Sequence, residues 1–230
     1  MLWLKAWLEI RWRILFVTGF VAFPLILHLL NPPSQATPGG RQVFLGVYAT
    51  FLAIVPLSLA GCGVKTQSGS PQPIRGGHKS TYFTLSLPVT RFRLFAVRAG
   101  LGMLAVIVVV LVACGLLWAT VPELQLTWVI ALEYVLAVCV CDCALYSLSL
   151  VLATFLDQVF QLWACMLIVM AGGFYSLRTS LPAFIDIFRA MGSASPIVTH
   201  TLPWAAMAVS LVISPILFLA ALKIVQTREY

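Results

Sequence analysis

The chain has 230 residues, of which 61% are hydrophobic and only 9% are charged, and its mean hydropathy is +1.02. A soluble domain carries about 25% charged residues, so this composition excludes a globule whose whole surface faces water. The net charge of +7 does not indicate nucleic-acid binding, because the basic residues flank apolar segments and no recognition helix or aromatic-basic surface accompanies them.

Six apolar segments are long enough to cross a bilayer, since a hydrocarbon core of about 30 Å requires about 20 apolar residues in a helix. Backbone polar groups cannot stay unpaired in lipid, so each crossing has to be helical. The predicted spans are residues 14–30, 43–64, 99–121, 126–155, 159–177 and 202–222. The sequence therefore predicts an all-α integral membrane protein, with residues 1–230 forming a single transmembrane domain.

The first segment outside the predicted spans, residues 1–13, has an amphipathic pattern. Trp3, Trp7 and Ile10 share one helical face, and charged residues occupy the opposite face. We expect an interfacial helix along the inner leaflet, with its tryptophans at headgroup depth. An ordinary cytoplasmic extension of the first span is the alternative.

Lysine and arginine are distributed unequally around the spans, which sets the orientation through the positive-inside rule. With the N-terminus in the cytoplasm, the inner segments hold Lys5, Arg11, Arg13, Lys65, Arg75, Lys79, Arg91, Arg93, Arg98, Lys223 and Arg228. The outer segments hold only Arg41, Arg178 and Arg189. An even number of spans then places both termini in the cytoplasm, in a multi-pass protein of the cell inner (plasma) membrane.

Two acidic residues, Glu133 and Asp142, lie inside the fourth predicted span. Charged groups in a membrane are costly and usually mark a pathway, a relay or an ion pair. Their nine-residue separation places them on opposite faces of a helix, so they are not a two-carboxylate catalytic pair. Asp142, Tyr146 and Ser149 form a polar stripe. We expect Asp142 to face a partner helix or a polar cavity; the alternative is a neutral side chain hydrogen-bonded to a neighbouring helix.

The short segment before the last span, residues 178–200, is expected outside the membrane. An amphipathic run over 181–188 predicts a short extracellular helix that lies on the outer leaflet or re-enters the membrane, followed by a turn at 192–196.

No residue pattern predicts a metal, cofactor or catalytic site in this chain. The six cysteines lie in or beside apolar segments without metal-ligand spacing, and we expect them to be buried free thiols. The run Gly76-Gly77-His78-Lys79-Ser80 lacks the adjacent Gly-Lys and the preceding strand of a phosphate-binding loop. Any use of ATP is therefore expected in a partner.

The cytoplasmic loop between the second and third spans, residues 65–98, begins with a Gly/Ser/Pro-rich stretch at 66–77. It continues with the run Leu85-Ser86-Leu87-Pro88-Val89-Thr90-Arg91. Residues 79–94 resemble the region before the third span of type-2 ATP-binding-cassette (ABC) exporter permeases, which carry a Leu-x-Leu-Pro-Val-Ser/Thr-Arg run there. The six-span topology with both termini inside is similar to that of the family along the whole chain.

The resemblance implies a coupling helix at residues 79–87, which seats in a separate ATPase subunit and transmits ATP-driven closure to the spans. It implies a coupling role for Lys79, Thr81, Tyr82, Phe83, Leu85, Leu87, Pro88 and Arg91. Tyr82 and Phe83 are expected to be the anchors, because exposed aromatic residues often carry binding energy at protein interfaces.

The function implied by the resemblance is that of a non-catalytic permease subunit in an exporter. Its expected partners are two copies of an ABC ATPase that binds ATP and Mg, a second copy of itself or a homologous permease, and membrane lipid. Two alternatives stay open at this point. The first is an integral membrane enzyme that modifies lipid, and the second is a non-transporting anchor or assembly subunit.

Overall fold

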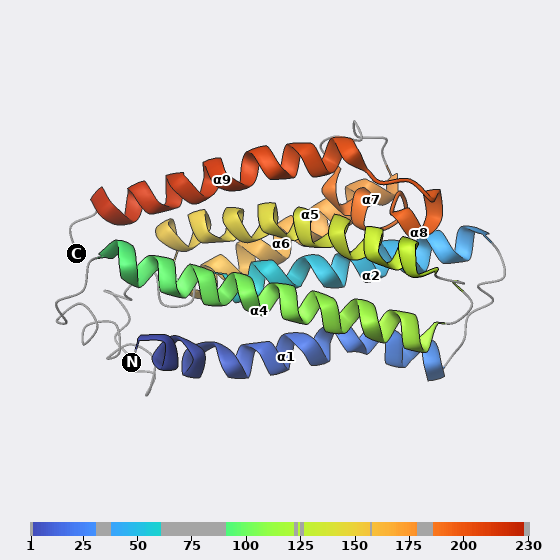
Figure 1. Cartoon of the computed structure of the whole chain (residues 1–230), viewed down its shortest axis with the longest axis horizontal. Helices are drawn as coiled ribbons and strands as arrows, with labels where there is room; N and C mark the ends of the chain where they lie inside the picture. The colour runs from blue at the N-terminus through green and yellow to red at the C-terminus, as the bar shows by residue number, and fades with distance from the viewer. Residues whose placement is uncertain are drawn as a thin grey trace.

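A computed structural model describes residues 2–30, 38–60, 91–121, 124, 127–156, 158–178 and 186–227. The regular elements in these residues are helices, and the long ones lie side by side in one bundle (Figure 1). The predicted all-α class is thereby confirmed for this part of the chain.

Six long helices and two short ones make up the described fold. The long helices are α1 (Leu2–Leu30), α2 (Pro38–Leu59), α4 (Arg91–Thr120), α5 (Trp128–Phe155), α6 (Gln158–Arg178) and α9 (Trp204–Thr227). The short helices are α7 (Ile187–Met191) and α8 (Pro196–Thr199). By length and composition, α1, α2, α4, α5 and α9 can each cross a membrane, whereas the apolar part of α6 is shorter, at Phe160–Phe174. The chain is thus a multi-pass membrane protein, and its sixth crossing stays a prediction.

The outward faces of the bundle are apolar, as a lipid solvent requires. Phe16 on α1 is 75% exposed, Leu132 on α5 is 68% exposed and Leu219 on α9 is 60% exposed. Large apolar side chains exposed on several helices would be poorly solvated by water, and hydrocarbon removes that penalty.

α1 and α4 begin well before their apolar segments. α1 is continuous from Leu2, so the predicted interfacial segment and the first span form one helix here. α4 begins at Arg91, eight residues before the predicted start at Ala99. The reason lies in packing, since Phe95 is buried and its ring centroid lies 5.6 Å from that of Phe218 on α9. This contact helps to stabilise the first turns of α4. Hydropathy alone does not predict these turns, because three arginines lower the mean hydropathy there.

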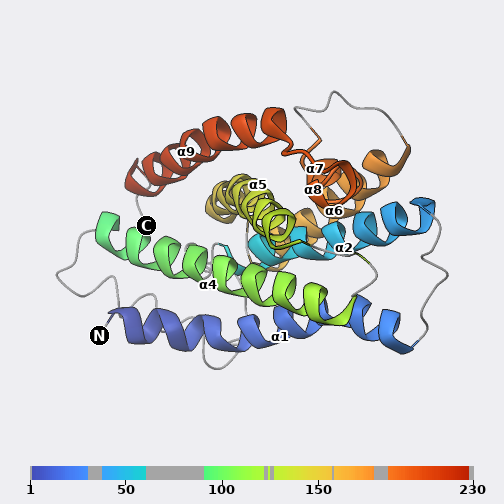
Figure 2. The same ribbon diagram turned by 45° about the vertical axis from the view of Figure 1, so that its right-hand side comes forward.

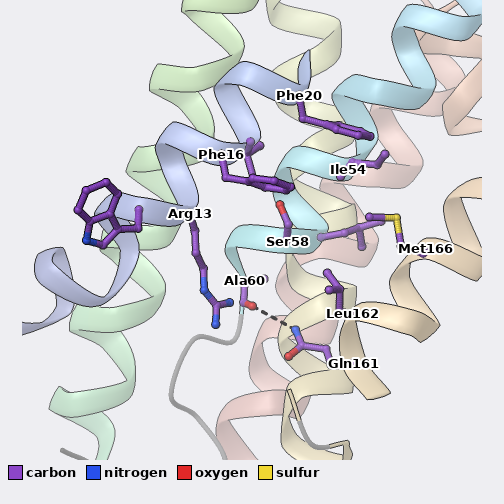
Figure 3. A pocket seen from close by; sticks show the side chains of 12 residues that line it. Arg13, Phe16, Phe20, Ile54, Ser58, Ala60, Gln161, Leu162 and Met166 are labelled. Carbon is purple, nitrogen blue, oxygen red and sulfur yellow. Dashed lines mark hydrogen bonds between the residues drawn. The ribbon is translucent and has the colours of Figure 1, made fainter. Parts of the chain in front are cut away.

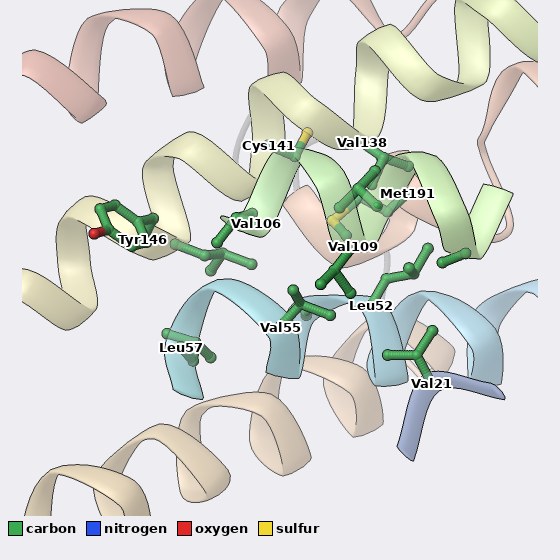
Figure 4. Close-up of a cluster of buried hydrophobic side chains, with 14 of the residues drawn as sticks. Val21, Leu52, Val55, Leu57, Val106, Val109, Val138, Cys141, Tyr146 and Met191 are labelled. Carbon is green, nitrogen blue, oxygen red and sulfur yellow. The ribbon is translucent and has the colours of Figure 1, made fainter. Parts of the chain in front are cut away.

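α5 lies at the centre of the bundle, in contact with α2, α4, α6, α7, α8 and α9 (Figure 2). Its buried residues Tyr134, Val138, Cys141 and Leu145 recur at spacings of three and four, which places them on one helical face. They join a hydrophobic cluster that also draws residues from the helices around α5. Figure 4 shows this cluster, with labelled side chains that include Val21, Leu52, Val106, Val138 and Met191.

The segment before α9 packs into the bundle rather than away from it. Asp186 caps α7, because its Oδ1 accepts a hydrogen bond from the backbone N–H of Arg189 at 2.8 Å. Burial raises the pKa of the Asp186 carboxyl, and the hydrogen bond and charge of Arg189 oppose that shift. Met191 is fully buried, and α7 contacts both α2 and α5. The predicted turn is present at residues 192–195, while residues 181–185 of the expected short helix lie outside the described part.

Gly192 sets how closely α7 approaches α2, which makes it a test of this packing. A β-carbon there would lie 2.9 Å from the Cα of Gly46 and 3.2 Å from the carbonyl oxygen of Leu45, neither of which can rotate away. We expect Gly192→Ala to lower the free energy of unfolding by about 1–3 kcal/mol, measured as thermal unfolding in detergent. The control is Gly115→Ala on α4, where the added carbon meets nothing within 4 Å. Equal melting temperatures for both variants would contradict the close approach.

Candidate functional site in the transmembrane core

The predicted site residues divide into two groups in the structure. Within the coupling group, Lys79, Thr81, Tyr82, Phe83, Leu85, Leu87 and Pro88 lie outside the described residues. Arg91 is the first residue of α4. The intramembrane group lies entirely on α5, so its geometry can be followed side chain by side chain.

Asp142 is completely buried near the middle of α5. Neither of its carboxyl oxygens has a hydrogen-bond partner among the described residues. An acidic side chain without a partner is expensive in a bilayer, so Asp142 differs from an ordinary hydrogen-bonded packing residue and remains the strongest single candidate for a functional group in the described core.

Tyr146 and Ser149 join α5 to its neighbours. The Tyr146 hydroxyl donates to the carbonyl oxygen of Ala99 on α4 at 2.8 Å. The Ser149 hydroxyl donates to the carbonyl oxygen of Leu57 on α2 at 2.9 Å. Both hydroxyls are buried and both bond to main chain, so two members of the predicted polar stripe act as interhelical links.

Gln161, on the first turn of α6, completes a three-helix junction that sequence reasoning missed. Its Nε2 donates to Ser149 Oγ at 3.0 Å and to the carbonyl oxygen of Ala60, just after α2, at 3.1 Å. Cys165 Sγ lies 3.5 Å from the same Ser149 hydroxyl. The signal in the sequence is an amide in the first turn of an apolar helix, where a buried polar group needs a partner.

A second polar junction joins α5 to α9. Ser147 Oγ and Ser214 Oγ lie 2.9 Å apart, and Ser214 also donates to the carbonyl oxygen of Cys143 at 3.1 Å. This contact lies beside Pro215, which removes one backbone donor within α9. Ser147 and Ser214 were not singled out from the sequence, because isolated serines in apolar helices are common.

Glu133 and Asp142 are not brought together. Both lie on the one continuous helix α5, so nine residues separate them by about 14 Å along its axis. Glu133 is partly exposed, whereas Asp142 is fully buried. The two acids therefore occupy different environments, as their spacing predicts.

The described cysteines are free thiols at positions Cys114, Cys139, Cys141, Cys143 and Cys165. Within the described ranges, no group of three or more His, Cys, Asp or Glu side chains could hold a metal ion. The buried polar side chains on the described long helices are instead hydroxyls, the Gln161 amide, the Asp142 carboxyl, His28 and Arg98.

Comparison of the chain with protein families, with curated proteins and with solved structures finds no match. The residues and their geometry are accordingly the support for the function proposed below.

The link between Tyr146 and Ala99 depends on the absence of a side chain at Gly102. A β-carbon at Gly102 would overlap the Tyr146 hydroxyl. We expect Gly102→Ala to displace that hydroxyl and to destabilise the fold by about 1–3 kcal/mol, read as a lower melting temperature in detergent. Gly100→Ala is the matched control, two residues away on the same helix, where the added carbon meets nothing within 4 Å. A Gly102→Ala protein as stable as this control would show that the tyrosine is free to move.

Asp142 and Ser149 should respond oppositely to small substitutions. Ser149→Ala removes a hydroxyl bonded to both α2 and α6, and we expect a loss of about 1–2 kcal/mol of stability. Asp142→Asn removes a carboxyl that has no described partner, so stability should be unchanged or higher. Thermal unfolding of both variants in the same detergent checks the contrast. A large loss of stability in Asp142→Asn would reveal a structural bond to the carboxyl.

Proposed function

We propose that this chain is the transmembrane permease subunit of an ABC exporter, coupling ATP hydrolysis by a separate ATPase subunit to substrate export. Two permease chains, either identical or homologous, work with two ATPase copies that bind ATP and Mg. The chain itself is not an enzyme. The single observation that carries the proposal is the run Leu85 to Arg91, which leads directly into a helix packed against the core.

The course of the helices supports an even number of crossings. The first residues of α1, α4 and α6 and the last residues of α2, α5 and α9 lie at the same end of the bundle (Figure 1). In the proposal α6, with 21 residues and a length of about 31 Å, is the fifth of six crossings. Most of the basic residues, Arg91, Arg93 and Lys223 among them, then lie at the cytoplasmic face of the inner membrane.

The packing of α4 supports a mechanical connection from the coupling segment to the core. One turn into α4, Phe95 contacts Phe218 of α9. One turn further on, the carbonyl of Ala99 accepts the hydrogen bond from Tyr146 of α5. A displacement that enters at Arg91 is therefore passed to two further helices within about 12 Å of helix length.

The geometry of the polar residues favours a permease over an enzyme that modifies lipid. Such an enzyme requires acids, histidine or serine to converge on one reacting atom. Here Ser149 and Tyr146 are bonded to backbone carbonyls, and Glu133 lies far from Asp142. The Ser149 and Tyr146 hydroxyls hold helices together, which is a structural role that a transporter subunit needs.

The coupling assignment is tested by Tyr82→Ala and Phe83→Ala in the full chain. Each variant should weaken association with the cognate ATPase by about 30-fold, since a buried aromatic anchor contributes about 2 kcal/mol or more. Co-purification and ATP-driven export from vesicles measure the effect. Both readouts should fall while the amount of folded chain in the membrane stays constant.

Trp118→Ala serves as the control, because Trp118 is an exposed aromatic residue of α4 at the opposite end of the bundle. It should leave ATPase association and export unchanged. Wild-type association and transport in both Tyr82→Ala and Phe83→Ala would remove the coupling role from residues 79–87. Export lost equally in all three variants would point to a general defect in the membrane domain.

A further inference from the structure

A groove of about 480 Å³ lies between α1, α2 and α6 (Figure 3). Its size falls in the range of about 300–1,000 Å³ typical of small-molecule sites. It opens to the outside of the bundle, because the exposed side chains of Trp12, Phe16 and Leu162 line it. The groove is therefore reached from the lipid side of the helices.

The lining changes from polar to apolar along the groove. Arg13, Ser58 and Gln161 lie at one end, beside the last turn of α2 and the first turn of α6. Phe20, seven residues after Arg13, lies about 10 Å deeper along α1. Ile54 and Met166 continue the apolar part on α2 and α6. This gradient matches an amphiphile whose head is at the membrane surface and whose tail points into the bilayer.

Arg13 is the single charged residue among the described residues that line the groove. It lies three residues inside the apolar stretch of α1 that begins at Ile10, a depth at which arginine extends its guanidinium toward the headgroups. In Figure 3 the Arg13 side chain reaches toward the end of α2 beside Ala60. A guanidinium presents several N–H donors and no acceptor, and it binds phosphate well.

The hydroxyl and the amide group that line the groove already donate hydrogen bonds within the protein. The Ser58 hydroxyl donates to the carbonyl oxygen of Val55 at 3.1 Å. The Gln161 amide donates to Ala60 and Ser149. Arg13 thus supplies the positive charge for a ligand head, and the apolar walls supply the surface for its tail.

We infer that this groove binds an anionic phospholipid of the surrounding membrane, with the headgroup phosphate on Arg13 and one acyl chain along Phe16, Phe20, Ile54 and Met166. The site requires only that the chain is inserted in a bilayer, so the lipid-binding proposal does not depend on the proposed transport function. Occupancy of the groove by lipid also fills space between α1 and α6, which both contact α2.

The test uses the purified full chain in detergent, titrated with phosphatidylglycerol and, separately, with phosphatidylcholine of the same acyl chains. Native mass spectrometry counts the lipids bound. The wild-type chain should retain one phosphatidylglycerol in preference to phosphatidylcholine. Arg13→Gln should weaken phosphatidylglycerol binding by about tenfold or more, as loss of a charge-assisted hydrogen bond predicts. Ile54→Trp, which fills the apolar part, should weaken the binding of both lipids.

Arg11→Gln is the matched control, because Arg11 carries the same charge two residues away, is exposed and does not line the groove. It should leave lipid binding unchanged. Equal losses in Arg11→Gln and Arg13→Gln would overturn the site, since only diffuse attraction to anionic lipid would remain. Displacement of the lipid by an equal concentration of inorganic phosphate would also overturn it. A third contrary result would be that Ile54→Trp dissociates a dimer of the chain while the number of bound lipids stays the same, because the groove would then be an interface between two copies.

Discussion

The fold depends on one constraint, which is that buried hydroxyl and amide groups in a bilayer must find their partners inside the protein. Three side chains of α5 meet it by hydrogen bonding to the helices around them. Tyr146 bonds to α4, Ser149 bonds to α2 and accepts from α6, and Ser147 meets Ser214 of α9. Each bond is modest in energy, but together they specify which helix lies on which side of α5. Apolar packing alone would leave that choice open, because lipid and leucine are equally apolar.

Small residues make these bonds possible. Asp142 lies outside the pattern, as do the buried hydroxyls of Tyr134, Ser195 and Ser210, which also lack a hydrogen bond among the described residues. Gly102 leaves room for the Tyr146 hydroxyl, and Gly192 lets α7 lie against Gly46 of α2. Both contacts bring backbone and side chain closer than any larger residue allows. The Asp142 carboxyl has no hydrogen bond among the described residues. The packing of this conformation does not explain the buried carboxyl. A different conformation of the helices would be expected to make new contacts there.

The sequence predicts the helices well and their partners poorly, for a physical reason. Hydropathy is a local property, so apolar segments and the polar face of Tyr146 and Ser149 are visible in a single window. Their acceptors lie 47 and 92 residues away in the chain and are backbone carbonyls, which no side-chain pattern reveals. The early start of α4 is hidden because its arginines mask the buried Phe95. The role of Gln161 is not predicted, because one buried amide produces no repeating pattern along the helix.

The same few residues connect the lipid-facing groove to the centre of the bundle. Leu57 is among the residues that line the groove, and its carbonyl accepts the hydrogen bond from Ser149 of α5. Gln161 also lines the groove and bonds to that serine. Any rearrangement of α5 that breaks these bonds must therefore change the shape of the groove. A ligand that binds more tightly to one shape of the groove therefore stabilises the matching arrangement of α5. By thermodynamic linkage, that arrangement of α5 strengthens binding of the ligand by the same free energy.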